Sequence, residues 1–299
     1  NHEAFPFDPS TIDAVIVTHA HLDHTGRIPK LVKEGFSGSV FLTPPTFDLM
    51  KLVLEDAEKL MRDAQEQKAQ PPLYRAGDVE KALSLCKTKT YSQYESFGDI
   101  KFRFRDAGHI FGSAFVEIEE SGGARATFSG DIGNEHVPIL RETAQLAETD
   151  VLVVESTYGN RIHEDESMRS QKLRDVIIRT AQRQGVLVIP AFAIERTQQL
   201  LFELNQLIDK GELPRIEVFL DSPMAIKATE VIKKYPEYYD AEARALVAAG
   251  EDFFQFNGLT LTPTRDDSKR INAANRPKVI IAGAGMMNGG RILHHLVRY

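Results

Sequence analysis

Residues 14–26 of this chain read Ala14-Val15-Ile16-Val17-Thr18-His19-Ala20-His21-Leu22-Asp23-His24-Thr25-Gly26. The first four are apolar and predict a buried strand, and a helix is expected from about Thr25 to Lys33. Three imidazoles and one carboxylate therefore lie on a strand-to-helix loop, where α/β folds commonly hold their ligands. Such groups are costly to bury together unless a cation holds them.

The spacing of these side chains predicts a metal site. His19 and His21 lie two residues apart, so on extended backbone they point the same way and can share one ion. Asp23 and His24 come after the turn and point elsewhere, which suits a second ion beside the first. Imidazole and carboxylate ligands without thiolate favour zinc, with manganese or iron as lesser options. The alternative is a solvated loop that happens to be rich in histidine. It is disfavoured because the chain has only nine histidines in 299 residues, so three of them would rarely fall within six positions by chance.

Two later segments offer ligands of the same type. His109 follows an alternating strand near Ile100–Arg105, and Asp131 follows a second strand near Arg125–Phe128. Taken alone, each would be an ordinary polar residue at a strand end. Their value comes from the first cluster, because together they would complete its ligand set.

These residues resemble a known family. The motif His19-x-His21-x-Asp23-His24, followed by His109 and Asp131, is similar to that of the metallo-β-lactamase superfamily of binuclear metallohydrolases. Four later segments narrow the resemblance to its β-CASP branch. That branch contains nucleases related to the endonuclease subunit of the messenger-RNA cleavage and polyadenylation machinery and to its bacterial and archaeal relatives. The four segments are Val153–Asn160, Pro190–Gln198, Asp221–Ala225 and Gly285–Arg291.

The resemblance implies the site residues. Six side chains would hold two zinc ions: His19, His21 and His109 one ion, Asp23 and His24 the other, and Asp131 both. The catalytic residues would be Asp23, Asp131 and Glu155, with Glu155 orienting the group that donates a proton to the leaving oxygen. One departure is Glu195, where relatives often have Gly, and a side chain there is expected to alter the nearby loop.

Three strand-to-helix loops in the second half carry candidates for substrate contact. Arg196 and Thr197 begin an expected helix, where free backbone N–H groups favour an anion, and Ser222 lies in a similar place. In the loop Gly289-Gly290-Arg291, small residues bring backbone close to a phosphate and the arginine can pair with it. His294, on the next helix, is the last candidate. The alternative is that these glycines only permit turns and the arginines are surface charges or interdomain ion pairs.

The expected elements predict an α/β protein with two domains. The resemblance implies that residues 1–160 form an incomplete metallo-β-lactamase αββα sandwich and residues 161–299 an inserted β-CASP domain, a parallel sheet flanked by helices. We expect an internal fragment truncated at both ends, because family members have strands before the position of Asn1 and further strands after Tyr299. One metal site would then lack its last ligand. The single cysteine, Cys86, is expected inside a helical stretch, Asp78–Lys87.

Composition narrows the class of protein. Apolar residues make up 42% of the chain, enough for sizeable cores, and no apolar run approaches a membrane span. One cysteine excludes an intrachain disulfide and favours a cytoplasmic setting. The net charge of −7 argues mildly against indiscriminate binding to nucleic acid, without excluding a local basic groove.

The function that the resemblance implies is zinc-dependent hydrolysis of RNA phosphodiester bonds, through a bridging hydroxide that the metals activate, in RNA processing or decay. RNA is the expected partner, a membrane is not, and a homodimer is compatible with the resemblance. Three alternatives stay open: a DNA-end nuclease of the same branch, a hydrolase of small esters, and an inactive RNA-binding scaffold.

Overall fold

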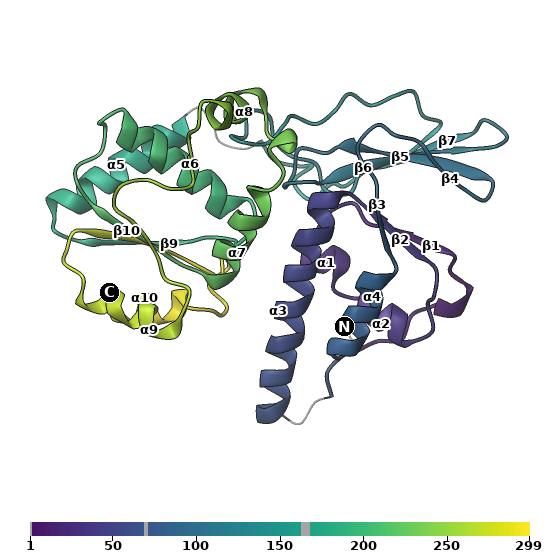
Figure 1. The fold of residues 1–299 in the computed structure, drawn as a ribbon, viewed down its shortest axis with the longest axis horizontal. Coiled ribbons are helices and arrows are strands. Elements are labelled where there is room, and N and C mark those ends of the chain that lie inside the picture. Colours follow the sequence, from purple (N-terminus) through teal and green to yellow (C-terminus); the bar gives the residue numbers. More distant parts are fainter. Residues whose placement is uncertain (1, 69–70, 163–167) are drawn as a thin grey trace. The chain divides into compact units, whose positions relative to one another are not determined.

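The structure, a computed structural model, describes residues 2–68, 71–162 and 168–299. It divides into two compact units, Asn1–Glu135 with Arg141–Thr157 and His136–Leu140 with Tyr158–Tyr299. Both units mix helices with sheets that contain parallel strands (Figure 1), which confirms the predicted α/β fold class. Among the described helices, none combines the length and the apolar character needed to cross a bilayer.

The first unit begins with a three-stranded parallel sheet of order β1-β2-β3. Parallel strands need crossover connections, and helices supply them here. The strands are β1 (Ala14–Ile16), β2 (Ser39–Leu42) and β3 (Cys86–Thr88). The helices are α1 (Leu22–Thr25), α2 (Ile28–Lys33), α3 (Pro44–Lys68) and α4 (Ala76–Ser84), and a short 3-10 helix covers Pro9–Thr11.

Two local predictions for this unit need correction. The helix expected from about Thr25 to Lys33 is present as α2 but begins only at Ile28, after the separate short helix α1. Pro29 in the first turn of α2 favours this start because its φ is fixed. The helix expected up to Lys87 ends earlier, and Cys86 begins β3 by pairing with Val40. Burial raises the pKa of the Cys86 thiol to about 12, so the thiol stays protonated at neutral pH.

The second sheet of this unit has five strands in the order β4-β5-β6-β7-β8. They are β4 (Glu95–Phe97), β5 (Ile100–Asp106), β6 (Ala114–Glu120), β7 (Arg125–Phe128) and β8 (Val151–Val153), and only β8 pairs in parallel. The alternation predicted for β5 is confirmed, since Phe102 and Phe104 are buried between less buried neighbours. Phe102 meets Phe41 of β2 edge to face at 5.1 Å, so one aromatic core joins the two sheets.

The second unit is built on a four-stranded parallel sheet of order β11-β10-β12-β9. Its strands are β9 (Val186–Pro190), β10 (Glu217–Asp221), β11 (Leu259–Leu261) and β12 (Lys278–Ala282). Its helices are α5 (Arg169–Gln182), α6 (Arg196–Asp209), α7 (Pro223–Ile232), α8 (Ala241–Ala248), α9 (Arg265–Arg270) and α10 (Ile292–Arg298), with 3-10 turns at Pro236–Tyr238 and Ile271–Ala273.

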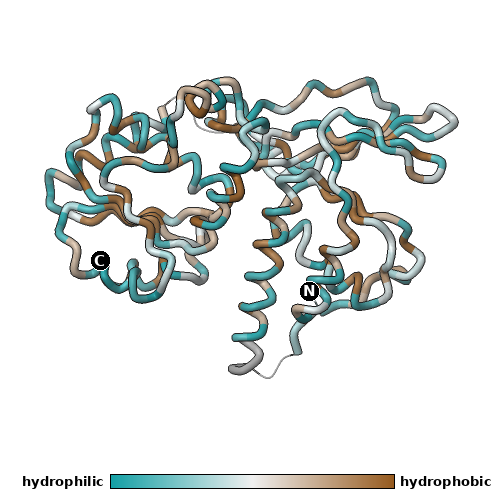
Figure 2. Tube along the Cα trace, in the orientation of Figure 1, coloured by the Kyte–Doolittle hydropathy of each residue, from teal (hydrophilic) through white to brown (hydrophobic). Residues whose placement is uncertain are grey.

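Figure 1 shows α5 and α6 on one face of this sheet and α9 and α10 on the other. Every residue of the central strand β12 is buried, as expected for a parallel strand covered on both faces. Apolar residues accordingly follow the strands in Figure 2. The carboxyl ends of all four strands meet at one edge, and the loops that leave this edge carry the substrate candidates predicted from the sequence.

Candidate metal centre

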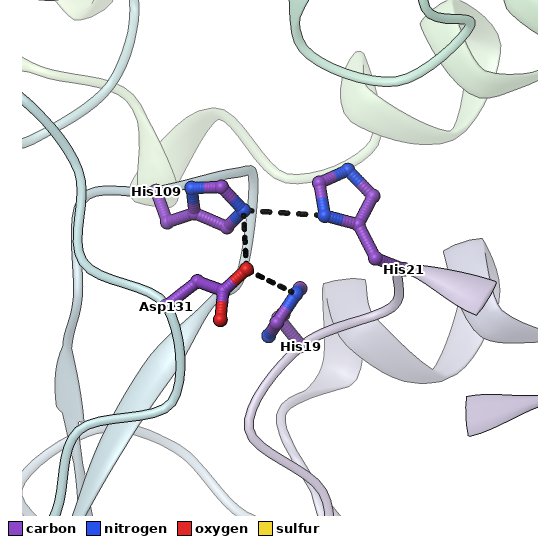
Figure 3. Close-up of side chains that lie close together, drawn as sticks. All are labelled: His19, His21, His109 and Asp131. Carbon is purple, nitrogen blue, oxygen red and sulfur yellow. Dashed lines mark hydrogen bonds and ion pairs between the residues drawn. The ribbon is translucent and has the colours of Figure 1, made fainter. Parts of the chain in front are cut away.

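Four side chains from three loops of the first unit converge (Figure 3). His19 and His21 follow β1, His109 follows β5, and Asp131 follows β7. Each offers one ligand atom, and these four atoms all lie within 4.8 Å of one another. The structure therefore brings together residues from three separate parts of the sequence, all of them predicted as ligands from residue type, spacing and the family resemblance.

The distances between these atoms suit donors that share a cation. Oδ2 of Asp131 lies 3.7 Å from Nε2 of His19 and 3.6 Å from Nε2 of His109. The same His109 nitrogen lies 3.2 Å from Nδ1 of His21. Two ligand atoms at about 2.1 Å from one tetrahedral ion are about 3.4 Å apart. The observed spacing is close to this value.

His19 supplies the strongest indication that a cation fits here. Its Nε2 atom is buried and has no hydrogen-bond partner, whereas its Nδ1 atom lies 3.1 Å from the Thr18 hydroxyl. A buried polar atom without a partner is costly, and natural proteins rarely keep one. Thr18 orients the ring, as groups beside metal ligands commonly do, and leaves the other nitrogen for a cation.

A second group of donors lies beside the first. Nε2 of His24 is 3.3 Å from Oδ1 of Asp131 and 3.7 Å from Oδ2 of Asp23. Asp131 thus directs one oxygen at His19 and His109 and the other at His24. Asp23, His24 and Asp131 could therefore hold a second cation. The Asp23 side chain is largely exposed to solvent.

The imidazoles are held neutral. Burial, followed by the neighbouring histidines, lowers the pKa of His19 to about 2. Burial, followed by His109, lowers the pKa of His21 to about 4, and burial also lowers the pKa of His109. A neutral imidazole keeps the lone pair that metal ligation needs, so at neutral pH the cluster has the protonation state of a ligand set.

Two glycines let the loops approach closely. Gly130 has φ of +56°, and a Cβ atom there would lie 2.7 Å from Cβ of Thr18. At Gly133 a Cβ atom would lie only 1.8 Å from the backbone oxygen of Gly108. Backbone cannot yield as a flexible side chain does. The Asp131 loop can therefore reach the two histidine-bearing loops only because these positions lack side chains.

Glu155 lies beside the same loop. Its Oε1 accepts the backbone N–H of Ile132 at 3.0 Å, and its Oε2 accepts that of Thr157 at 3.2 Å. Burial alone would raise the pKa of this carboxyl, but the hydrogen bonds outweigh that effect and lower it. An ionised Glu155 therefore holds the backbone next to Asp131.

The substrate candidates lie at the carboxyl edge of the second unit's sheet. Nη1 of Arg196 donates to Oε1 of Gln199 at 3.0 Å, and nearly half of the Arg196 side chain is exposed. Thr197 is buried and donates its hydroxyl to the Phe192 carbonyl at 2.7 Å. Ser222 caps α7 by accepting the N–H of Ala225. Thr197 and Ser222 therefore hold their own loops in this structure.

Arg291 takes part in a buried network that sequence reasoning missed. Its guanidinium donates to Oδ1 of Asp221 and to the Thr262 carbonyl, both at 2.6 Å. His295 contacts the other Asp221 oxygen at 2.7 Å, whereas the neighbouring His294 is exposed. Gly289 and Gly290 lie in the loop before Arg291, and Gly290 has φ of +77°. The available signal was an aspartate at the end of the apolar strand β10.

Comparisons with known protein families give one match within each of the two compact units. The profile described as the metallo-beta-lactamase superfamily matches residues 3–40, and the profile described as the Beta-Casp domain matches residues 197–299. A ribonuclease of Thermus thermophilus is 38% identical over 296 residues, which cover 99% of this chain and 66% of that protein.

Two archaeal proteins are also similar. The transcription termination factor FttA of Methanosarcina mazei is 35% identical over 98% of this chain and 46% of its own length. An RNase J-like protein of Methanocaldococcus jannaschii is 31% identical over 97% of this chain and 64% of its own length. The chain thus spans about half to two thirds of the length of these relatives.

Proposed function

Because this chain belongs to the β-CASP branch of the metallo-β-lactamase superfamily, we propose that the protein is a metal-dependent hydrolase of RNA phosphodiester bonds. One observation carries the proposal: Nε2 of His19 is buried without a partner inside a cluster of neutral imidazoles that converge on Asp131. Relatives named as a ribonuclease and as an RNase J-like protein support RNA as the substrate.

We propose two zinc ions as the cofactor. His19, His21 and His109 would hold one ion, Asp23 and His24 the other, and Asp131 would contribute to both. When bound, the ions supply an activated water as the nucleophile and neutralise the charge that builds on the phosphate. Ligands of nitrogen and oxygen without sulfur suit this metal.

The chain's own residues prepare this chemistry. Thr18 orients the His19 ring, so its Nε2 atom points at the Asp131 carboxylate. Glu155 fixes the backbone on the carboxyl side of Asp131, which keeps the shared ligand in place while substrate binds and leaves. We assign Asp131 and Glu155 to the catalytic machinery on these grounds, and Asp23 because its carboxylate lies 3.7 Å from Nε2 of His24.

Substrate contacts belong to the second unit in this proposal. Arg196 has an exposed guanidinium at the start of α6, and His294 is exposed on α10. The remaining candidates, Thr197, Ser222, Gly289, Gly290 and Arg291, would act by shaping the loops and offering backbone N–H groups to phosphate. We also propose that residues 1–160 belong to the metallo-β-lactamase domain and residues 161–299 to the inserted β-CASP domain.

The alternatives are less well supported. A catalytically silent scaffold has no need of a convergent ligand cluster, and this chain has one. Hydrolysis of a small ester has no use for a second unit of this size. A DNA-end nuclease shares the same chemistry, and it differs only in the polymer that it prefers.

The test uses the zinc-loaded protein with single-stranded RNA, single-stranded DNA and a chromogenic ester in parallel. The expected result is cleavage of RNA that Asp131→Ala reduces by at least a hundredfold, together with loss of bound zinc measured by elemental analysis. Asp99→Ala removes an exposed carboxylate of the same unit and should change neither quantity. Undiminished RNA cleavage by the Asp131 variant, or faster cleavage of DNA or ester, contradicts the proposal.

The homodimer stays a prediction of the family resemblance, and the cytoplasmic location stays a prediction of the cysteine content. Light scattering on purified protein measures the mass of the particle, and a mass of one chain contradicts the dimer. Cell fractionation checks the location.

A further inference from the structure

The carboxyl edge of the second unit's sheet carries an exposed apolar surface that the proposed hydrolysis does not use. It consists of Phe192, Met286 and Met287, whose exposed fractions are 53%, 69% and 48%. We call these three residues the apolar platform. Large apolar side chains left exposed on neighbouring loops are candidates for a binding site.

The two loops that form the platform are held side by side. Strands β9 and β12 pair in register, so that Pro190 lies opposite Ala282, and the loops leave from these ends. Gly285 packs against the Phe192 ring, because a Cβ atom at this position would lie 2.9 Å from Cδ2 of Phe192. Met286 and Met287 follow Gly285 directly in the sequence, so their backbone lies next to this contact with the phenyl ring.

The backbone beneath the platform is fixed. The Phe192 carbonyl accepts both the N–H and the hydroxyl of Thr197, at 3.2 Å and 2.7 Å. The second loop is closed by hydrogen bonds from Met287 N–H to the Ala284 carbonyl and from Ala284 N–H to the Gly289 carbonyl. A site whose backbone is held before the ligand arrives loses little entropy on binding.

The chemistry of the edge favours a ligand with a flat π face. An exposed phenyl ring on one loop and two exposed thioethers on the neighbouring loop offer stacking and polarisable contact, which a nucleobase matches. Arg196 lies four residues after Phe192, yet the Glu195 carboxylate is 4.0 Å from its Nε atom and offsets part of its charge. A phosphate chain without bases would therefore bind weakly here. A nucleotide would use both the apolar side chains, through its base, and Arg196, through its phosphate.

The size and the place of the platform point the same way. Ligands of α/β folds bind beyond the carboxyl ends of parallel strands, and the platform lies there. Three side chains are far fewer than the roughly 20 residues a side that a stable protein interface buries. A single unpaired base fits the platform better than a protein partner does.

We propose that the apolar platform stacks an unpaired base of single-stranded RNA, with Arg196 beside the adjoining phosphate. The identity of the polymer rests on the proposed function, and the stacking rests on the geometry of the second unit. Because every base has a π face, the platform should bind with little preference for sequence.

The test measures the affinity of the protein for a fluorescent oligouridine and for an abasic RNA backbone of equal length. Both titrations use the Asp131→Ala background, so that the RNA stays intact. Phe192→Ala should weaken oligouridine binding by about five- to a hundredfold and leave abasic binding unchanged. Phe192→Tyr keeps a ring and should restore the affinity. Val247→Ala, an exposed apolar residue on α8 of the same unit, should have no effect.

Two results overturn the platform. One is that Phe192→Ala binds each of the two RNAs as tightly as the parent protein does. The other is unchanged RNA affinity with an altered particle mass, which would make the platform a protein interface. If wild type cleaves RNA and Asp131→Ala does not, either result defeats the platform alone. If wild type neither binds nor cleaves RNA, the proposed function and the platform fail together.

Discussion

Nε2 of His19 faces Oδ2 of Asp131 at 3.7 Å. This distance is too long for a hydrogen bond, which would bring such atoms to about 2.9 Å. The nitrogen is nevertheless buried and without a partner. The protein thus maintains an unfavourable arrangement that a cation between the two atoms would relieve, and the relief is measurable as stability.

Zinc should stabilise the first unit. At a free zinc concentration a hundred times the dissociation constant, the free energy of unfolding should rise by about 2.7 kcal/mol over chelated protein. Denaturant unfolding with and without chelator measures the difference. His19→Ala should lose most of the gain, and the exposed His2→Ala should keep it. An equal gain in both variants would remove His19 from the ligand set.

Gly133→Ala should disrupt the metal centre from outside the ligand set. Its Cβ atom would collide with the backbone of Gly108, so the Asp131 loop must move away from His109. We expect a loss of at least 2 kcal/mol in unfolding free energy or a tenfold weaker zinc affinity, by denaturant titration and competition with a chelator. Gly122→Ala is the matched control, since nothing lies within 4 Å of its added Cβ. Identical behaviour of both variants contradicts the packing argument.

Glu195 stores backbone strain at the start of α6. Its φ and ψ of +74° and −68°, with the Arg196 N–H donating to the Ile194 carbonyl at 3.1 Å, define the strained form of the γ-turn. Glu195→Gly should be about 1 kcal/mol more stable than Glu195→Ala, measured by urea unfolding. Both variants lose the carboxylate, including its contact with Gln199, so their difference isolates the backbone. Equal stability would show that the loop is unstrained.

Asp221 should make the second unit sensitive to acid. Burial alone would raise its pKa, but hydrogen bonds outweigh burial and hold the pKa at about 2. The donors are His295, Ser268, Thr262 and Arg291. Because this value lies below the unfolded pKa of about 3.9, the charged form stabilises the folded unit. That contribution, about 2.6 kcal/mol, is complete above about pH 5 and is lost as the pH falls toward about 1.

Asp221→Asn should remove this acid dependence and cost at least about 3 kcal/mol at neutral pH, because Arg291 loses its buried partner. Urea unfolding at several pH values measures both effects. Asp266→Asn changes an exposed carboxylate of α9 and should leave the profile as it is. A profile that stays acid-sensitive in the Asp221 variant would assign the effect to other carboxyls.

Local pattern was enough for the fold class and for most strands. The alternation in β5 and the apolar runs of β9, β10 and β12 predicted elements that the structure contains, because periodicity reports burial along one segment. The Cys86 prediction failed because pairing with β2, a contact across more than forty residues, outweighed a weak helical pattern.

The sequence by itself determined which residues could be ligands, since ligand type and short spacing are properties of the chain. Only the tertiary structure decided that Asp131 divides its two oxygens between His19 and His24, and that Arg291 faces Asp221 from 70 residues away. It also decided that the ring of Phe192 stays exposed. The physical reason is that partners, burial and the direction of a side chain arise when distant segments pack, and no local pattern encodes that packing.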